Sequence, residues 1–308
     1  MLDPRELYEL ESGQPAAGEL GSPVMLHALS GFIDAGTAGQ LAADHLLESL
    51  DHRLLARFDV DQLHDYRARR PVMTFVEDHW ADYRAPSLEL HLVRDEAGTA
   101  FLMLTGVEPD AQWERFAAAV LQLVQRYGVR LSVGFHAIPM AVPHTRPVGV
   151  TSHATRQELV AGRRLWVGRV QVPGNITALI ELRLGEAGHD AAGFAVHVPH
   201  YLSQTGYPDA AAVLLQEVSR MTGLALPVQP LLEAGEQVRT AIAGQLAEQP
   251  EVAAVVKSLE EQYDAFVGAQ GKSLLGGDDR PLPTGDELGA ELERFLAEEN
   301  ERHQGGEA

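Results

Sequence analysis

The stretch VMLHALSGFIDAGTAGQLAADHLLESL, residues 24–50, predicts the start of an α/β fold. Residues 24–29 form a mainly apolar run with the length of a buried strand. Residues 31–39 contain three glycines and indicate a loop, after which apolar residues at helical spacing predict a helix to about residue 50. A buried strand that leads directly into a helix is the repeating unit of α/β proteins.

The same alternation continues along the chain. A hairpin signal surrounds residues 95–98, and Pro208 and Gly223 suit the first turn and the end of a helix. We predict further strands at residues 54–58, 87–93, 99–104, 129–135, 164–172 and 194–198, and further helices at 110–127, from 176 and at 208–222. Asp110 is the expected cap of the first of these helices. Together these elements predict a mixed sheet with helices on both faces.

The composition changes after Pro227 and Pro230, where the pattern becomes helical only. We predict an N-terminal extension at 1–20, an α/β core domain at 21–230, a helical hairpin at 231–270 and an acidic tail at 271–308. The apolar stripe that starts at Leu231 is expected to pack against the second helix of the hairpin, around Leu259. Residues 231–308 hold 17 acidic and 6 basic residues, which is typical of a solvated or interaction segment.

Charge and composition exclude several classes of protein. A net charge of −20 argues against nucleic-acid binding through a general basic surface. The absence of cysteine excludes disulfides, thiol catalysis and cysteine metal sites. Because the chain shows no membrane-length apolar run and no secretory signal pattern, we expect a cytoplasmic protein that does not bind membranes.

The loop at 31–39 has the right position to cradle a phosphate, between a strand and a helix. It is not a P-loop, because Thr37 and Ala38 stand where that motif requires lysine and then serine or threonine. Asp34 would also place a carboxylate beside the phosphate. Two interpretations therefore remain, a small-ligand site at Gly31, Asp34 and Gly36, or a tight connection between strand and helix.

A second candidate pocket follows the strand at 129–135. Loops at the ends of strands in α/β sheets often hold ligands. Five residues would form an anion pocket there, together with the residues of the first loop. They are His136, His144, Thr145, Arg146 and His153. The alternative interpretation is that these histidines serve packing and hydrogen bonding in the fold.

The segment at 58–71 alternates acidic and basic side chains and suits a salt-bridged surface or a protein interface. Its candidate interface residues are Asp59, Asp61, Asp65, Tyr66, Arg67, Arg69 and Arg70. The spacing of the aspartates lacks the glycine and glutamate of a calcium loop, and no other motif indicates a metal or a cofactor. A serine-hydrolase elbow is also missing, so the residues do not indicate a chemical reaction.

Five segments, taken in order, resemble the actinobacterial branch of the family of the second proteasome assembly chaperone. They are GFIDAGTA at 31–38, DHL at 44–46, the segment 58–71, LTGVEPDAQW at 104–113 and FAVHVPHY at 194–201. The resemblance implies a three-layer α/β/α sandwich, related to the phosphorylase fold, and a homotrimer that assists proteasomes or another protein complex. The chain lacks the nucleoside-binding Glu-Met-Glu of the phosphorylases, which argues against that activity.

Two functions from different classes follow. The first is a non-catalytic, oligomeric interaction protein of the assembly-chaperone kind, without cofactor or metal. The second is an enzyme or sensor that binds a small anionic metabolite, nucleoside-like or phosphate-like, between Gly31 and His144. An interaction protein requires exposed apolar or charged surface, whereas an enzyme requires convergent polar groups in a cleft.

Overall fold

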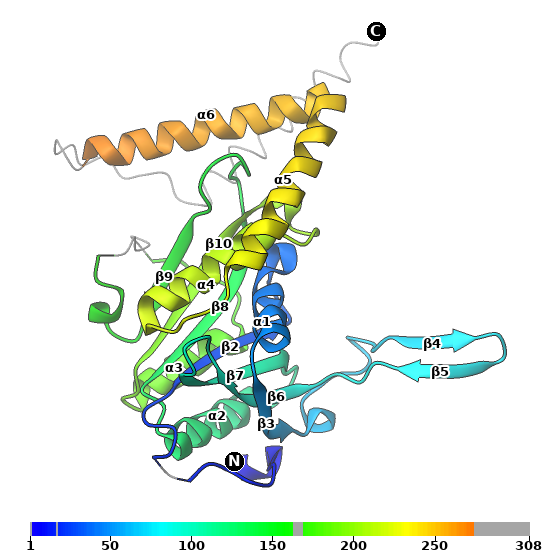
Figure 1. The fold of residues 1–308 in the computed structure, drawn as a ribbon, viewed down its shortest axis with the longest axis vertical. Helices are drawn as coiled ribbons and strands as arrows, with labels where there is room; N and C mark the ends of the chain where they lie inside the picture. The colour runs from blue at the N-terminus through cyan, green and yellow to red at the C-terminus, as the bar shows by residue number, and fades with distance from the viewer. Residues whose placement is uncertain (1, 17, 163–168, 274–308) are drawn as a thin grey trace. The chain divides into compact units, whose positions relative to one another are not determined.

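The computed structural model describes residues 2–16, 18–162 and 169–273. The chain divides into two compact units, residues 1–260 and residues 261–308. An eight-stranded mixed sheet forms the centre of the first unit, in the order β1-β3-β6-β7-β2-β8-β10-β9 (Figure 1). The strands are β1 (Tyr8–Leu10), β2 (Val24–Ser30), β3 (His52–Phe58), β6 (Leu88–Arg94), β7 (Ala100–Val107), β8 (Leu131–Met140), β9 (Val150–Ala154) and β10 (Ala191–Pro199).

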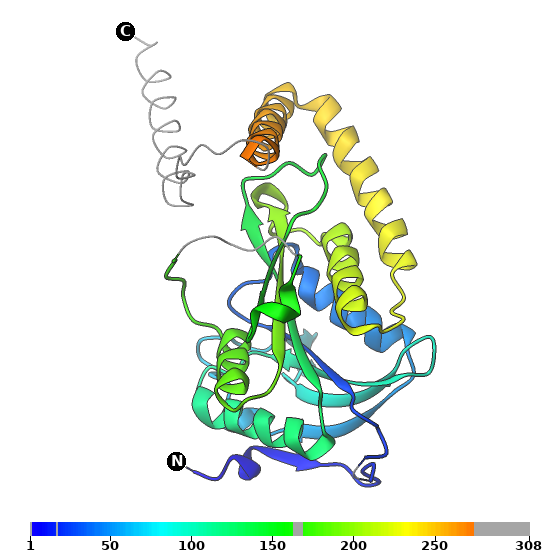
Figure 2. The ribbon, with the colours of Figure 1, turned by 90° about the vertical axis from the view of Figure 1, so that its left-hand side faces the viewer.

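The four central strands, β7, β2, β8 and β10, run parallel, and the remaining pairs are antiparallel. Helices α1 (Ala38–Ser49) and α4 (Pro208–Thr222) pack on one face of the sheet, and α2 (Trp113–Tyr127) and α3 (Ile176–Glu186) pack on the other (Figure 2). Each face buries its own apolar cluster. The predicted α/β/α sandwich with a mixed sheet is therefore confirmed.

Most helix ends follow the sequence signals. The Asn175 side chain accepts a hydrogen bond from the Ala178 N–H and caps α3, while Pro208 opens α4. Gly223 closes α4 with a φ of 81°, a left-handed conformation that glycine adopts without steric cost. The expected cap at Asp110 is wrong, because α2 begins after Gln112 and the Asp110 carboxylate binds elsewhere.

Three parts of the strand assignment differ from expectation. The N-terminal extension supplies β1, which pairs with β3 at the edge of the sheet. Strand β9 and a separate hairpin, β4 (Met73–Val76) with β5 (His79–Tyr83), were not predicted. Of the strand expected at 164–172, residues 164–168 lie outside the described residues, and residues 169–172 form no strand.

Two helices follow the sheet, α5 (Gln229–Glu248) and α6 (Pro250–Ser273). The predicted apolar face of α5 is buried, because Leu231 and Ile242 join the core cluster that α4 shares with the sheet. Leu259 of α6 is also buried, and the packing of these two helices against each other stays a prediction. Most of the predicted acidic tail, residues 274–308, lies outside the described residues. None of the helices in the described ranges is both long and apolar enough to span a membrane.

Candidate functional site

The loop after β2 is organised by one carboxylate. Asp34 accepts hydrogen bonds from the N–H groups of Gly39 and Gln40 in the first turn of α1, at 2.8 and 2.9 Å. It also accepts one from the Ala137 N–H of β8, at 3.1 Å. Burial raises the pKa of Asp34, although these three donors act in the opposite direction. The carboxylate thus takes the helix N–H groups that a phosphate would need, which favours the structural interpretation of this loop.

The two glycines of this loop allow close packing. A side chain at Gly31 would collide with the Glu108 side chain, only 2.2 Å from an added Cβ. Gly36 has a φ of 62°, and its added Cβ would lie 2.8 Å from the Tyr207 side chain. Both positions therefore have no room for a larger residue, and their ligand role stays a prediction.

Glu108 at the end of β7 has a role that the sequence did not reveal. Its buried carboxylate accepts a hydrogen bond from the Phe32 N–H through one oxygen, at 2.9 Å, and from the Ile176 N–H through the other, at 2.8 Å. A single side chain therefore joins the loop after β2 to the start of α3. The residues around Glu108, which precedes Pro109 and a helix, do not indicate that its side chain makes this bridge.

Histidines meet beneath α3. Four residues are cross-strand partners in a row over the neighbouring strands β2, β8, β10 and β9. They are His27, Gly134, Gly193 and His153, in that order. The two glycines leave room for the rings, because an added Cβ at Gly134 would lie 2.6 Å from His27 and one at Gly193 would lie 2.1 Å from His153. Glu181 of α3 contacts the His153 ring at 2.8 Å.

The buried members of this group are held neutral. Burial first, and then the neighbouring histidines, lower the pKa of His27 to about 3 and that of His136 to about 4. Neither ring nitrogen of His27 has a hydrogen-bond partner among the described residues. Among all the residues that the structure describes, no group of three or more His, Cys, Asp or Glu side chains has a geometry that could hold a metal ion.

The remaining pocket candidates lie in the connection between β8 and β9 and bind other parts of the chain. The His144 Nδ1 lies 2.7 Å from the Tyr201 hydroxyl. Thr145 donates a hydrogen bond to Glu260 of α6, and the Arg146 guanidinium lies 3.4 Å from the same carboxylate. The Glu260 carboxylate thus contacts Thr145 and Arg146, the two residues that were expected to bind an anion. The ligand site at these residues stays a prediction.

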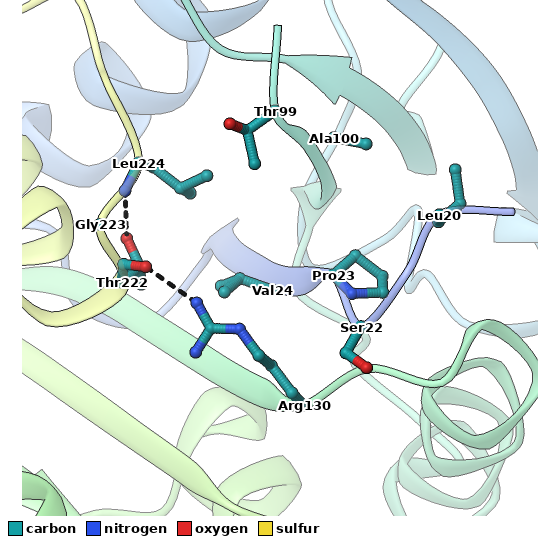
Figure 3. Close-up of a pocket in the computed structure, with 10 residues that line it drawn as sticks. All are labelled: Leu20, Ser22, Pro23, Val24, Thr99, Ala100, Arg130, Thr222, Gly223 and Leu224. Atoms are coloured by element: carbon teal, nitrogen blue, oxygen red, sulfur yellow. Dashed lines mark hydrogen bonds between the residues drawn. The ribbon is translucent and has the colours of Figure 1, made fainter. Parts of the chain in front are cut away.

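One hollow lies away from these residues. It has a volume of about 380 Å³ and is lined by residues that include Pro15, His52 and Arg94. A neighbouring hollow of about 230 Å³ lies at the amino ends of β2 and β7, where Arg130 donates a hydrogen bond to the Thr222 carbonyl (Figure 3). None of the predicted ligand residues lines either hollow.

The segment 58–71 is tied to the core through Arg69. Its guanidinium lies 2.8 Å from the Asp110 carboxylate and also donates to the Glu108 carbonyl. Tyr66 donates a hydrogen bond to Asp61 at 2.5 Å, so part of the expected charge network forms within one chain. Arg67 and Arg70 remain exposed. The role of these residues in an interface stays a prediction.

The hairpin that follows this segment, which we call the arm (residues 72–84), projects away from the core (Figure 1). Phe75 pairs with Trp80 and Met73 pairs with Tyr83, so these four side chains share one face. Trp80 and Tyr83 can share that face because the register shifts between Thr74 and Phe75, which leaves Ala81 without a cross-strand partner. The Phe75 and Trp80 rings contact each other with centroids 5.0 Å apart.

This aromatic face is open to solvent. Phe75 is 54% exposed and Trp80 is 63% exposed, and Met73 and Tyr83 are also exposed. Contiguous exposed apolar surface on a folded protein marks an interaction site more often than scattered single residues do. The arm is therefore the clearest candidate functional surface in the described part of the chain.

Comparison with known proteins agrees with the fold. The model of the PAC2 family matches residues 28–246. The chain belongs to the PAC2 family. The family match confirms the resemblance to this family that we found in the sequence. A search of curated proteins found no match.

Solved structures of actinobacterial proteins resemble this PAC2 chain over most of its length. The Mycobacterium tuberculosis protein of unknown function Rv2714 is 48% identical, with a TM-score of 0.84 over 88% of this chain and 93% of that one. A Corynebacterium glutamicum protein of unknown function is 39% identical, with a TM-score of 0.81 over 85% and 98% of the two chains. The Mycobacterium tuberculosis proteasome-assembly chaperone homologue Rv2125 is 28% identical, with a TM-score of 0.69 over 76% and 99%.

Substitution of Asp34 tests the structural interpretation of the loop in this PAC2 protein. Asp34→Ala leaves three backbone N–H groups without their acceptor, so we expect a loss of about 2 kcal/mol in the free energy of unfolding. Urea unfolding followed by circular dichroism measures it, with the exposed Asp51→Ala as the control. An unchanged stability would make Asp34 a candidate ligand residue again.

Proposed function

We propose that this protein is a non-catalytic, cytoplasmic subunit that self-associates, as a homotrimer, and acts as an interaction or assembly-chaperone-like protein. The observation that carries the proposal is the exposed aromatic face of the arm. Aromatic residues and methionine are enriched where proteins bind each other, and Phe75, Trp80 and Tyr83 supply such a surface. Burial of these rings would contribute much of the binding free energy.

The contacts of the predicted pocket residues support the same choice over the small-ligand alternative. The Asp34 carboxylate takes the N–H groups at the start of α1, and Glu260 faces Arg146. A metabolite would have to displace one of these carboxylates before it could bind. Among the described residues, no part of the chain buries the aromatic face of the arm, where Phe75, Trp80 and Tyr83 are exposed.

A link to proteasomes is the most specific form of the proposal. It rests on membership of the PAC2 family and on the likeness to the relative described as a proteasome-assembly chaperone homologue. In this form, the oligomer binds subunits of a larger complex through protein surfaces alone, without a cofactor. Neither nucleic acid nor a membrane is a partner in it.

The arm variant Phe75→Ser/Trp80→Ser tests the proposal. Because the two rings are exposed in a single chain, their loss should leave the fold intact and remove the apolar contact. We expect the wild type to sediment as an oligomer and the variant to sediment as a monomer of 33.4 kDa. Val255→Ser is the matched control, because Val255 is 54% exposed on α6, outside the arm. A variant that sediments like the wild type would contradict the role of the arm.

A further inference from the structure

The aromatic face of the arm carries a sulfur atom. Met73 is the cross-strand partner of Tyr83, next to the pair formed by Phe75 and Trp80. Met73 is 49% exposed. Its thioether is apolar and polarizable, so methionine packs favourably against aromatic rings and is enriched where proteins bind each other. Met73 therefore belongs to the surface that we propose for self-association.

Met73 is also the most exposed of the methionines that the structure describes. Met25 and Met103 are buried in the core, and Met140 and Met221 are only partly exposed. The sequence has no cysteine, whose thiolate is the other side-chain sulfur that oxidants attack. Among the described residues, Met73 is therefore the sulfur group most open to an oxidant in solution.

Oxidation would change the Met73 side chain from apolar to polar. With hydrogen peroxide as the oxidant, the sulfur forms a bond to one peroxide oxygen, and the O–O bond breaks. The sulfur loses two electrons and becomes a sulfoxide, while the other oxygen takes up the proton of the first and leaves as water. A polar S–O group is costly to bury against aromatic rings when it has no hydrogen-bond donor.

We propose that peroxide oxidation of Met73 prevents self-association, so that the arm forms a redox-sensitive contact. This inference rests on the proposed function, because it requires that the aromatic face is buried between copies. The Met73 sulfur is open to solvent in the single chain and would be covered in the oligomer. Association should therefore protect the sulfur, whereas oxidation of a dissociated chain should keep that chain apart.

Peroxide treatment of the full chain tests this redox sensitivity. The protein is incubated with hydrogen peroxide until its subunits have had time to exchange, and catalase then removes the peroxide. Peptide mass spectrometry measures the fraction of Met73 that has gained one oxygen, and light scattering gives the mass in solution. We expect the untreated chain to be oligomeric and the oxidised chain to have the monomer mass of 33.4 kDa. Treatment with methionine sulfoxide reductases and a thiol reductant should then restore the oligomer.

Two variants assign the effect to Met73. Met140→Leu/Met221→Leu removes the two partly exposed methionines outside the arm, and leucine is close to methionine in volume. Peroxide should dissociate this variant as fully as it dissociates the wild type. Met73→Gln introduces a polar amide in place of the thioether and should be monomeric without peroxide. Its circular dichroism should show an unchanged fold, because Met73 is exposed in the single chain.

The possible failures have different meanings. An untreated wild type that is monomeric at all concentrations would contradict the proposed function itself. An oligomer that persists after Met73 is oxidised, or in Met73→Gln, would overturn the inference and leave self-association standing. Resistance of Met140→Leu/Met221→Leu to peroxide would overturn it too, because a methionine outside the arm would then be responsible. So would a Met73 that stays unoxidised after subunit exchange, because the arm would then never be open to the oxidant.

Discussion

Gly106→Ala should destabilise the protein far more than the addition of one methyl group usually does. Gly106 lies in β7 opposite Leu88, with a φ of 129°. An added Cβ would lie 2.1 Å from the Ser87 carbonyl oxygen and 2.7 Å from the Leu88 Cα. Both are backbone atoms of the neighbouring strand, so no side chain can rotate away. We expect a loss of about 3 to 5 kcal/mol and a melting temperature lower by about 10 °C.

Gly98→Ala is the matched control for this experiment. Gly98 also has a positive φ, 82°, but no atom lies within 4 Å of an added Cβ. Its substitution should therefore cost only about 1 kcal/mol, the conformational penalty of an alanine in that region. Urea unfolding of the two variants separates the loss of stability caused by the steric collision from the loss caused by the positive φ. Equal losses would contradict the close approach of β6 and β7 at this point.

Acid should destabilise the fold through His27. Its pKa falls from 6.5 to about 3 on burial, so between these values the unfolded chain binds a proton that the folded chain does not. The contribution of the neutral ring to stability is therefore complete above pH 6.5 and declines as the pH falls. The slope is roughly 1.4 kcal/mol per pH unit for one such group. At about pH 4.5, we expect a loss of about 2 to 3 kcal/mol from His27 alone.

His27→Leu isolates this contribution, because leucine fills similar space and carries no proton. The neighbouring groups that face His27 are His136 of β8, His153 of β9 and Thr177 of α3, with Glu181 beside His153. His136 titrates in the same direction, so the variant should keep part of the acid sensitivity. Unfolding free energies of wild type and variant, measured from about pH 7 to about pH 4.5, should diverge steadily. Parallel curves would show that His27 is not buried as a neutral ring.

The central elements of the fold were predictable because each carries a local signal. The apolar run of β2, the Asn175 cap of α3 and the Gly223 end of α4 depend on the chemistry of a few neighbouring residues. The arm lacks such a signal. Its turn places Glu77, not glycine or asparagine, at a positive φ, and the register shift sets Trp80 and Tyr83 three residues apart on one face. A search for simple alternation therefore misses it.

The candidate pocket was less predictable, because its contacts come from distant parts of the chain. Nothing near Arg146 in the sequence indicates that Glu260 lies against it, or that Tyr201 meets His144. The local pattern also favoured a helix cap at Asp110, whereas the structure pairs this residue with Arg69 and with the Asp65 N–H. Charged residues acquire their partners from tertiary packing, which a local pattern does not contain.

The mass of the wild-type chain in solution tests the central claim, self-association, most directly. Static light scattering on the full chain at micromolar concentration should give three times the chain mass of 33.4 kDa, and the value should hold on dilution within that range. A mass of 33.4 kDa throughout the range would contradict the account, because the exposed aromatic face of the arm would then remain uncovered in the protein alone.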